Sequence, residues 1–119
     1  MEINGVDIWL DGPASPDDVS LVLRGAQASW PSAVVELADG TYLGSISEAL
    51  KHQWVLPSEL FIYFNADALD AWDNLGRTDY NSAHVIYCTV QSTCVTIVSE
   101  GASIELAQRL LCLVEMSRG

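Results

Sequence analysis

The sequence predicts an α+β domain in which a mainly antiparallel sheet of about five or six strands carries three or four helices. Strand and helix patterns alternate along the chain, and two of the strand pairs are separated only by turn residues, as in β-hairpins. Because 50% of the 119 residues are hydrophobic, the chain can bury a substantial core. No segment resembles a linker, so residues 1–119 are expected to form one domain.

The chain is predicted to begin with a short strand, Gly5–Leu10, followed by an amphipathic helix. Ser15 can cap this helix, and Pro31 ends it because the residue before a proline disfavours the helical conformation. Apolar residues recur at spacings of three and four, which places them on one face that would pack on a sheet: Val19, Val22, Leu23, Ala26 and Trp30.

A hairpin and a short helix are predicted next. Asp39-Gly40 is typical of a two-residue turn with positive φ, and it would join a strand at residues 33–38 to one at residues 41–43. A capping box, Ser45-Ile46-Ser47-Glu48, then predicts a short helix through about Gln53.

The second half of the chain is predicted to contain three strands and two helices: strand Glu59–Phe64, helix Ala66–Leu75 stopped by Gly76, strands His84–Val90 and Thr93–Val98 around a turn at Gln91-Ser92, and helix Ser103–Met116. The first of these strands has aromatic residues on both faces, which indicates a central position. The helices are expected to cover one face of the sheet, which gives a two-layer domain. Because two strands are almost continuously apolar, a mixed sheet with helices on both faces remains an alternative.

Charge gives the main indication of function. The chain has 16 Asp and Glu residues against 5 Lys and Arg, a formal net charge of -11. Such a field repels nucleic acid and anionic membranes and attracts a basic partner.

The N-terminus lacks the pattern of a signal peptide, and the longest apolar run near the C-terminus, Leu110–Val114, is too short to span a membrane. We therefore expect a cytoplasmic protein. Its three cysteines, Cys88, Cys94 and Cys112, are expected to be reduced and buried.

The strongest candidate binding site is an acidic helix face. Asp67, Asp70 and Asp73 are spaced by three, which places them on neighbouring turns of one face; Trp72 lies beside them, and Asp79 follows. Carboxylates accept bidentate hydrogen bonds from arginine, and an exposed tryptophan would add an apolar anchor. The alternative interpretation is an ordinary solvated helix face. No metal or other cofactor is expected, because neither a calcium loop nor a histidine ligand accompanies the aspartates.

A second acidic group near the N-terminus is the weaker candidate, because two of its members are already expected to stabilise a helix start: Asp7, Trp9, Asp11, Asp17 and Asp18.

Catalytic patterns are absent from the sequence. His84 and Cys88 share a strand face, but four residues of strand separate their backbones by roughly 13 Å, too far for a nucleophilic pair. There is no GxSxG turn, no glycine-rich phosphate loop and no basic cluster for nucleic acid. We therefore predict no catalytic residue.

The acidic segment Asn65–Gly76, preceded by Glu59–Phe64 and followed by a hairpin and a helix, resembles small bacterial immunity proteins that accompany polymorphic toxins. The resemblance covers roughly the second half of the chain and carries over no individual residue. It implies a non-enzymatic protein that binds and occludes one cognate, more basic toxin.

Two other functions remain open. Abundant carboxylates could pair in a pocket with a raised pKa, which would favour a small enzyme. The final helix is apolar nearly all round, with Leu106 and Leu113 away from its main stripe, so a homodimeric adaptor is the third hypothesis.

Overall fold

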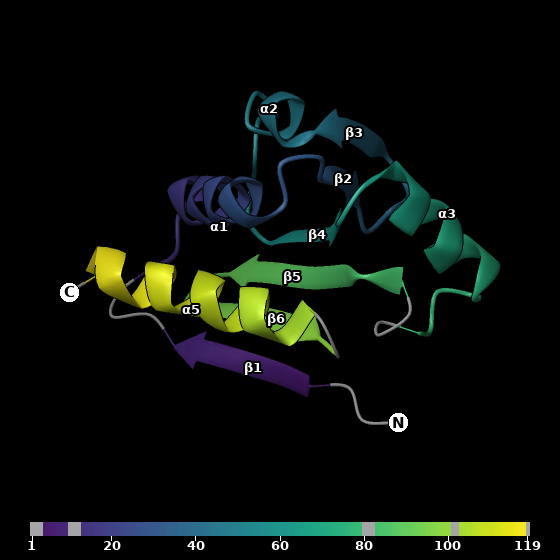
Figure 1. The fold of residues 1–119 in the computed structure, drawn as a ribbon. Coiled ribbons are helices and arrows are strands. Elements are labelled where there is room, and N and C mark those ends of the chain that lie inside the picture. The colour runs from purple at the N-terminus through teal and green to yellow at the C-terminus, as the bar shows by residue number, and fades with distance from the viewer. Residues whose placement is uncertain (1–3, 10–12, 80–82, 101–102, 119) are drawn as a thin grey trace.

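The computed structural model describes residues 4–9, 13–79, 83–100 and 103–118 (Figure 1). Strands and helices alternate in the order that the sequence predicted. The elements are β1 (Asn4–Trp9), α1 (Pro16–Ser29), β2 (Val34–Leu37), β3 (Tyr42–Ser45), α2 (Ile46–Ala49), β4 (Ser58–Tyr63), α3 (Ala66–Asn74), β5 (Val85–Gln91), β6 (Cys94–Ser99) and α5 (Ile104–Arg118).

All six strands join one sheet in the order β1-β6-β5-β4-β2-β3, and every neighbouring pair is antiparallel. The α+β prediction with a mainly antiparallel sheet is confirmed, and the mixed sheet is wrong. The helices, however, lie on both faces, as that alternative expected, and not on one face alone. The near-continuous apolarity of β4 and β5 has another cause: both strands lie at the centre of the sheet, where each face is partly covered.

The helices divide unequally between the two faces of the sheet. Side chains alternate along each strand, and those of Leu60, Ile62 and Ile86 face the core that α1, α2 and α5 cover. Tyr63 and Val85 face the opposite side, where α3 packs. In Figure 1, α1 and α5 lie together in front of the sheet, and α3 lies apart from them at one end. The acidic helix therefore occupies a face of its own.

The α1 helix forms as its sequence predicted. Ser15 accepts a hydrogen bond from the Asp17 backbone, and the Asp18 carboxylate accepts one from the Ser15 backbone at 2.9 Å, which completes a capping box. All five residues of the predicted apolar face are buried: Val19, Val22, Leu23, Ala26 and Trp30. Burying such large side chains contributes roughly 1.5–3 kcal/mol each, so packing on the sheet holds the helix in place.

The close contact between α1 and α5 depends on Gly25. A Cβ atom at this position would lie 2.7 Å from both Leu110 Cδ2 and Leu113 Cδ1. Leu106 is buried and Leu113 packs at the edge of the same core. The second layer that the broad apolar surface of α5 requires is therefore supplied by α1, and this helix no longer argues for a second subunit.

The first hairpin differs from its prediction by one residue. Leu37 donates to the Thr41 carbonyl at 2.8 Å, and Gly40 donates to the Leu37 carbonyl at 2.9 Å. The loop therefore has three residues, with Gly40 at φ 97°, rather than a two-residue turn at Asp39-Gly40. The Asp39 side chain accepts from the Thr41 backbone at 2.9 Å, which stabilises the turn.

The short helix after Ser45 ends at Ala49 rather than near Gln53. The Ala49 carbonyl accepts from the His52 backbone and from the Trp54 indole at 3.0 Å, so it is not available to continue the helix.

The second hairpin is shifted by one residue from its prediction. Gln91 pairs with Cys94, so Ser92 and Thr93 form the turn instead of Gln91-Ser92. His84 has φ 52° and precedes β5, so it does not share a strand face with Cys88.

The cysteines are free, and only Cys88 is buried; Cys94 is half-buried and Cys112 is exposed. The expectation that all three are buried is therefore wrong.

Among the described residues, no helix combines the length and the apolar character needed to cross a membrane.

Candidate functional site

The acidic helix α3 has well-defined ends. Asn65 caps its first turn by accepting a hydrogen bond from Ala68 N at 2.8 Å. At the other end, Gly76 N donates to the Asp73 carbonyl at 3.1 Å and Arg77 N donates to the Trp72 carbonyl at 2.9 Å. This pair of bonds is a Schellman motif, and Gly76 supplies its positive φ of 70°. The turn directs the chain so that Arg77 lies against its own helix.

The predicted carboxylates lie at the surface. Asp67, Asp70 and Asp73 are exposed, and Asp79, five residues beyond the helix, is half-buried. Trp72 is 1% exposed and belongs to the core beneath α3. The prediction that Trp72 is a surface anchor is therefore wrong. The aspartates, spaced by three, lie on the solvent-facing side of α3. Trp72 lies on the apolar side of the helix, which packs on the sheet and is therefore buried.

Trp72 joins an aromatic cluster on the α3 side of the sheet. The Phe61 ring lies 5.8 Å from that of Trp72, 5.0 Å from that of Tyr87 and 6.1 Å from that of Tyr63. Centroid separations in this range are favourable for aromatic pairs. Strand β4 thus uses its aromatic residues to seat α3.

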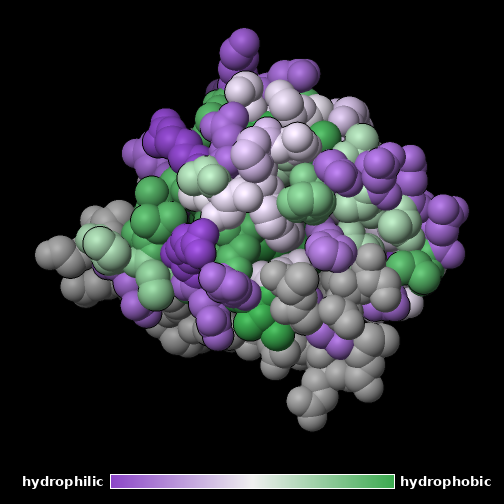
Figure 2. Space-filling view, in the orientation of Figure 1, coloured by the Kyte–Doolittle hydropathy of each residue, from purple (hydrophilic) through white to green (hydrophobic). Residues whose placement is uncertain are grey.

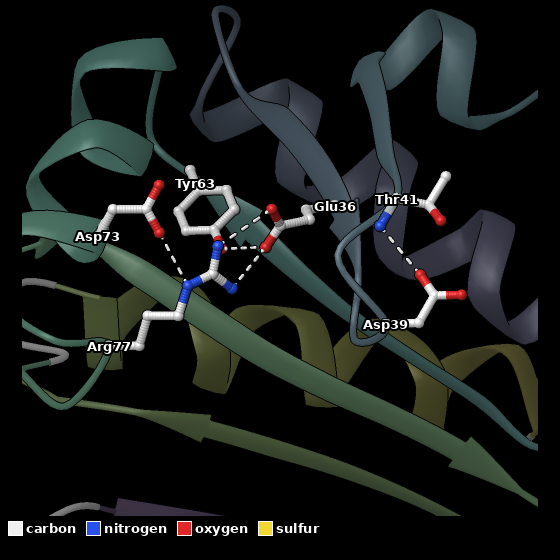
Figure 3. A network of polar contacts seen from close by, with 6 residues as sticks. All are labelled: Glu36, Asp39, Thr41, Tyr63, Asp73 and Arg77. Carbon is white, nitrogen blue, oxygen red and sulfur yellow. Dashed lines mark hydrogen bonds and ion pairs between the residues drawn. The ribbon is translucent and has the colours of Figure 1, made fainter.

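A polar network joins α3 to strand β2 (Figure 3). Glu36, which is buried, accepts from the Tyr63 hydroxyl at 2.8 Å and from Arg77 Nη1 and Nη2 at 2.9 and 3.3 Å. Arg77 Nε also donates to Asp73 at 2.8 Å. Here we call Glu36, Tyr63, Asp73 and Arg77 the helix clasp. A bidentate arginine–carboxylate pair is strong and fixes geometry, so the clasp sets the position of the α3 end.

Ionisation within the helix clasp is coupled. Burial, followed by the hydrogen bond and charge of Glu36, raises the pKa of Tyr63 well above its usual range. The hydrogen bond to Glu36 raises the pKa of Arg77, so its guanidinium stays protonated. Both donors therefore keep their protons at any pH at which the protein would work, which is the behaviour of a structural network.

Sequence reasoning missed this network. Glu36 lies in an apolar strand and Arg77 in a loop far along the chain, so only the pairing of β2 with β4 brings them together. The one available signal was a charged residue inside an otherwise apolar strand, which requires a partner.

Charge is distributed unevenly over the molecule. Arg24, Lys51, Arg109 and Arg118 belong to α1, the loop after α2, and α5. On β4, α3 and the segment that follows to Asp79, Arg77 is the one Lys or Arg, and the helix clasp engages it. Among the described residues, Asp67 and Asp70 form no ion pair, and both are exposed to solvent.

Two exposed apolar side chains adjoin the helix clasp, one in the sheet and one along the chain. Tyr42 is 54% exposed and pairs across the β2–β3 ladder with Glu36 of the helix clasp. Leu75, at the end of α3, is 40% exposed. Figure 2 shows mainly hydrophilic residues over α3, at the right of the molecule, with hydrophobic ones among them. We call Tyr42, Asp67, Asp70 and Leu75 the acidic helix surface.

An open cleft of about 490 Å³ lies at the other end of β2 and β4. We call it the turn cleft; it is lined by Leu37, Ala38, Asp39, His52, Gln53, Trp54, Val55, Pro57, Ser58 and Glu59. It brings together two carboxylates, Asp39 and Glu59. Hydrogen bonds from Thr41 lower the pKa of Asp39, so this group is not prepared to donate a proton as a catalytic acid would.

The weaker N-terminal candidate is divided by the fold. Asp18 is buried in the α1 capping box, whereas Asp17 is exposed beside it. The side chains of Asp7 and Trp9 and the whole of Asp11 lie outside the described residues. Within the described part of the chain, no group of three or more His, Cys, Asp or Glu residues could hold a metal ion.

Comparison of the chain with protein families, with characterised proteins and with solved structures gave no match.

Proposed function

We propose that this protein is a non-enzymatic binding module, an immunity-type inhibitor that occludes a cognate, more basic toxin in the cytoplasm. The observation that carries the proposal is the acidic helix surface: Asp67 and Asp70 are exposed and form no ion pair within the described residues, and the exposed apolar side chains of Tyr42 and Leu75 adjoin the helix clasp, Tyr42 as the strand partner of Glu36 and Leu75 between Asp73 and Arg77 along the chain. Uncompensated charge accelerates and orients encounter with a basic protein, whereas apolar anchors slow dissociation.

The net charge of -11 supports the same choice of partner. Most of the cations belong to the opposite, helical side of the molecule, so a basic protein would meet the strongest attraction on the α3 side. The helix clasp holds α3 in place before binding, which limits the conformational entropy that an interface would lose.

The first test is to identify the partner. The tagged protein is co-expressed with the product of the adjacent gene, and the complex is isolated and its stoichiometry measured. We expect a tight one-to-one complex with a basic protein, and we expect co-expression to relieve that protein's toxicity. Recovery of the protein alone would overturn the immunity proposal.

The second test places the interface. The double variant Asp67→Asn with Asp70→Asn should weaken partner affinity about tenfold or more and reduce its salt dependence, because two steering charges are lost. Tyr42→Ala and Leu75→Ala should mainly increase the dissociation rate. Glu105→Gln with Glu115→Gln is the matched control, since it removes two exposed carboxylates from α5. Equal losses in both double variants would place the interface elsewhere.

A further inference from the structure

The turn cleft is an open depression whose volume falls within the range of ligand pockets. Specific pockets in proteins occupy roughly 300–1,000 Å³, and this cleft measures about 490 Å³. Its lining combines the buried Trp54 with Val55, which is 71% exposed, and with Pro57. The cleft can therefore cover the aliphatic part of a long side chain.

Hydrogen bonds fix the walls of the turn cleft. On one side, the three-residue loop is closed by backbone bonds and by the Asp39–Thr41 contact of 2.9 Å. On the other, the Trp54 indole donates to the Ala49 carbonyl at 3.0 Å and Ser58 Oγ donates to the Val55 carbonyl at 2.9 Å. A cleft with walls held in this way loses little conformational entropy when it is filled.

The charges of the turn cleft select for a cation. Its lining contains the carboxylates of Asp39 and Glu59 and no Lys or Arg; His52 is the other ionisable group. The two carboxylates come from neighbouring chain segments, because Ala38 N donates to the Glu59 carbonyl at 3.1 Å. Asp39 bonds Thr41, whereas the Glu59 side chain forms no hydrogen bond or ion pair within the described residues.

We propose that the turn cleft receives an arginine side chain from the basic protein partner. Its guanidinium would bond Glu59 and Asp39, and its methylene groups would lie against Val55 and Trp54. Arginine fits better than lysine because its planar guanidinium matches carboxylates in a bidentate way. This inference rests on the proposed function, and it adds a second contact distinct from the acidic helix surface.

The test uses a small probe, so that it does not depend on the partner. Isotope-labelled protein is titrated with N-acetyl-arginine methylamide, and the backbone amide signals and the tryptophan indole N–H signals are followed by nuclear magnetic resonance. We expect saturable shifts at Trp54, Val55 and the 38–40 loop. The neutral analogue N-acetyl-citrulline methylamide, which has nearly the same shape, should cause none. Equal shifts with both probes, or shifts spread evenly over α3 as well, would overturn the proposal.

Variants of the turn cleft sharpen the test. Glu59→Gln should weaken probe binding about tenfold through the loss of a charge-assisted bond. Asp39→Asn keeps the side-chain oxygen that stabilises the turn and should also weaken binding. Val55→Lys places a cation at an exposed position on the rim and should abolish it. Glu115→Gln on α5 is the matched control and should leave binding unchanged; a loss equal to that of Glu59→Gln would mean that only net charge matters.

The failure of this inference can be told apart from that of the proposed function. If Glu59→Gln leaves probe binding intact while the Asp67→Asn and Asp70→Asn pair weakens the partner complex, the turn cleft proposal falls and the acidic helix surface stands. If the probe binds as expected and the α3 variants keep full partner affinity, the cleft inference stands and the α3 interface falls.

Discussion

At the scale of single residues, the structure differs from the sequence-based prediction mainly at buried polar groups. Glu36 is almost fully buried yet charged, and it is stabilised by two donors from distant parts of the chain, Tyr63 and Arg77. Neither donor could be assigned from the sequence, because the contact depends on strand register and on the Schellman turn that positions Arg77. The exposed aspartates of α3, in contrast, followed directly from helical spacing.

Removing the charge of Glu36 should destabilise the fold. Glu36→Gln keeps the shape of the side chain but places an amide among donors, and we expect a loss of about 1–2 kcal/mol in the free energy of unfolding. The Arg77 contribution is reduced by solvent, because that side chain is 40% exposed. Asp73→Asn breaks only the exposed pair and should cost less than about 0.5 kcal/mol. Urea denaturation of both variants measures the difference, and equal losses would contradict a buried role for Glu36.

Alkaline pH should reveal the environment of Tyr63. Its pKa is raised by burial and by Glu36, so the folded protein keeps a proton that the unfolded chain loses above about pH 10. The corresponding stability is fully present below that pH and declines as the pH rises further. Tyr63→Phe should therefore show a shallower decline between about pH 10 and 12. Parallel denaturation curves for the two proteins would contradict this.

The three thiols should react at different rates. Burial raises the pKa of Cys88 to about 12, so both its access and its thiolate fraction are low. With a thiol reagent at about pH 8, close to the usual thiol pKa, we expect Cys112 to react first, Cys94 more slowly and Cys88 only after unfolding. Mass spectrometry of labelled peptides measures the order. Labelling of Cys88 in the native protein at the rate of Cys112 would contradict the assigned core.

At the scale of elements, the sequence predicted what local chemistry controls and missed what neighbours impose. Caps, apolar stripes and the stop at Gly76 located α1 and α3, and alternation located the strands. The β2–β3 turn and the end of α2 were each misplaced, because neither the pairing of Leu37 with Thr41 nor the bond from the Trp54 indole to the Ala49 carbonyl can be read from residue types. The candidate site was predicted only in part. The exposed carboxylates were found from helical spacing, but the burial of Trp72 was not, because it depends on which face of α3 packs on the sheet.

The packing of α1 on α5 should tolerate no larger residue at position 25. Gly25→Val would drive branched atoms into Leu110 and Leu113, and we expect a loss of about 1–3 kcal/mol from overpacking. Gly25→Ala offers a finer comparison. Alanine has a higher helix propensity than glycine, and this gain opposes the smaller clash of its Cβ with the ends of the Leu110 and Leu113 side chains. Thermal unfolding measures both. A Val variant as stable as the native protein would show that the helices can separate without cost.

At the scale of the whole molecule, the uneven charge makes stability and binding respond to salt in opposite directions. With a net charge of -11, the excess carboxylates repel one another in the compact state, and salt screens that repulsion. Raising NaCl from about 10 to 300 mM shortens the screening length well below the molecular diameter and should raise Tm by about 4 °C or more. The same change should weaken capture of a basic partner. A Tm that falls with salt would mean that internal ion pairs outweigh the repulsion.

The pairing of β1 with β6 has a consequence for how the chain folds during its synthesis. Val6 pairs with Ile97, so all of the intervening residues are made before β1 can meet its partner. The hairpin of β2 with β3, in contrast, can close as soon as it emerges. Contacts so distant in sequence slow folding, and an unpaired strand is exposed to association with other chains in the meantime. Residues 4–9 therefore have no sheet partner until β6 has been made, and a ribosome stalled before residue 94 would hold a sheet that lacks both β6 and β1.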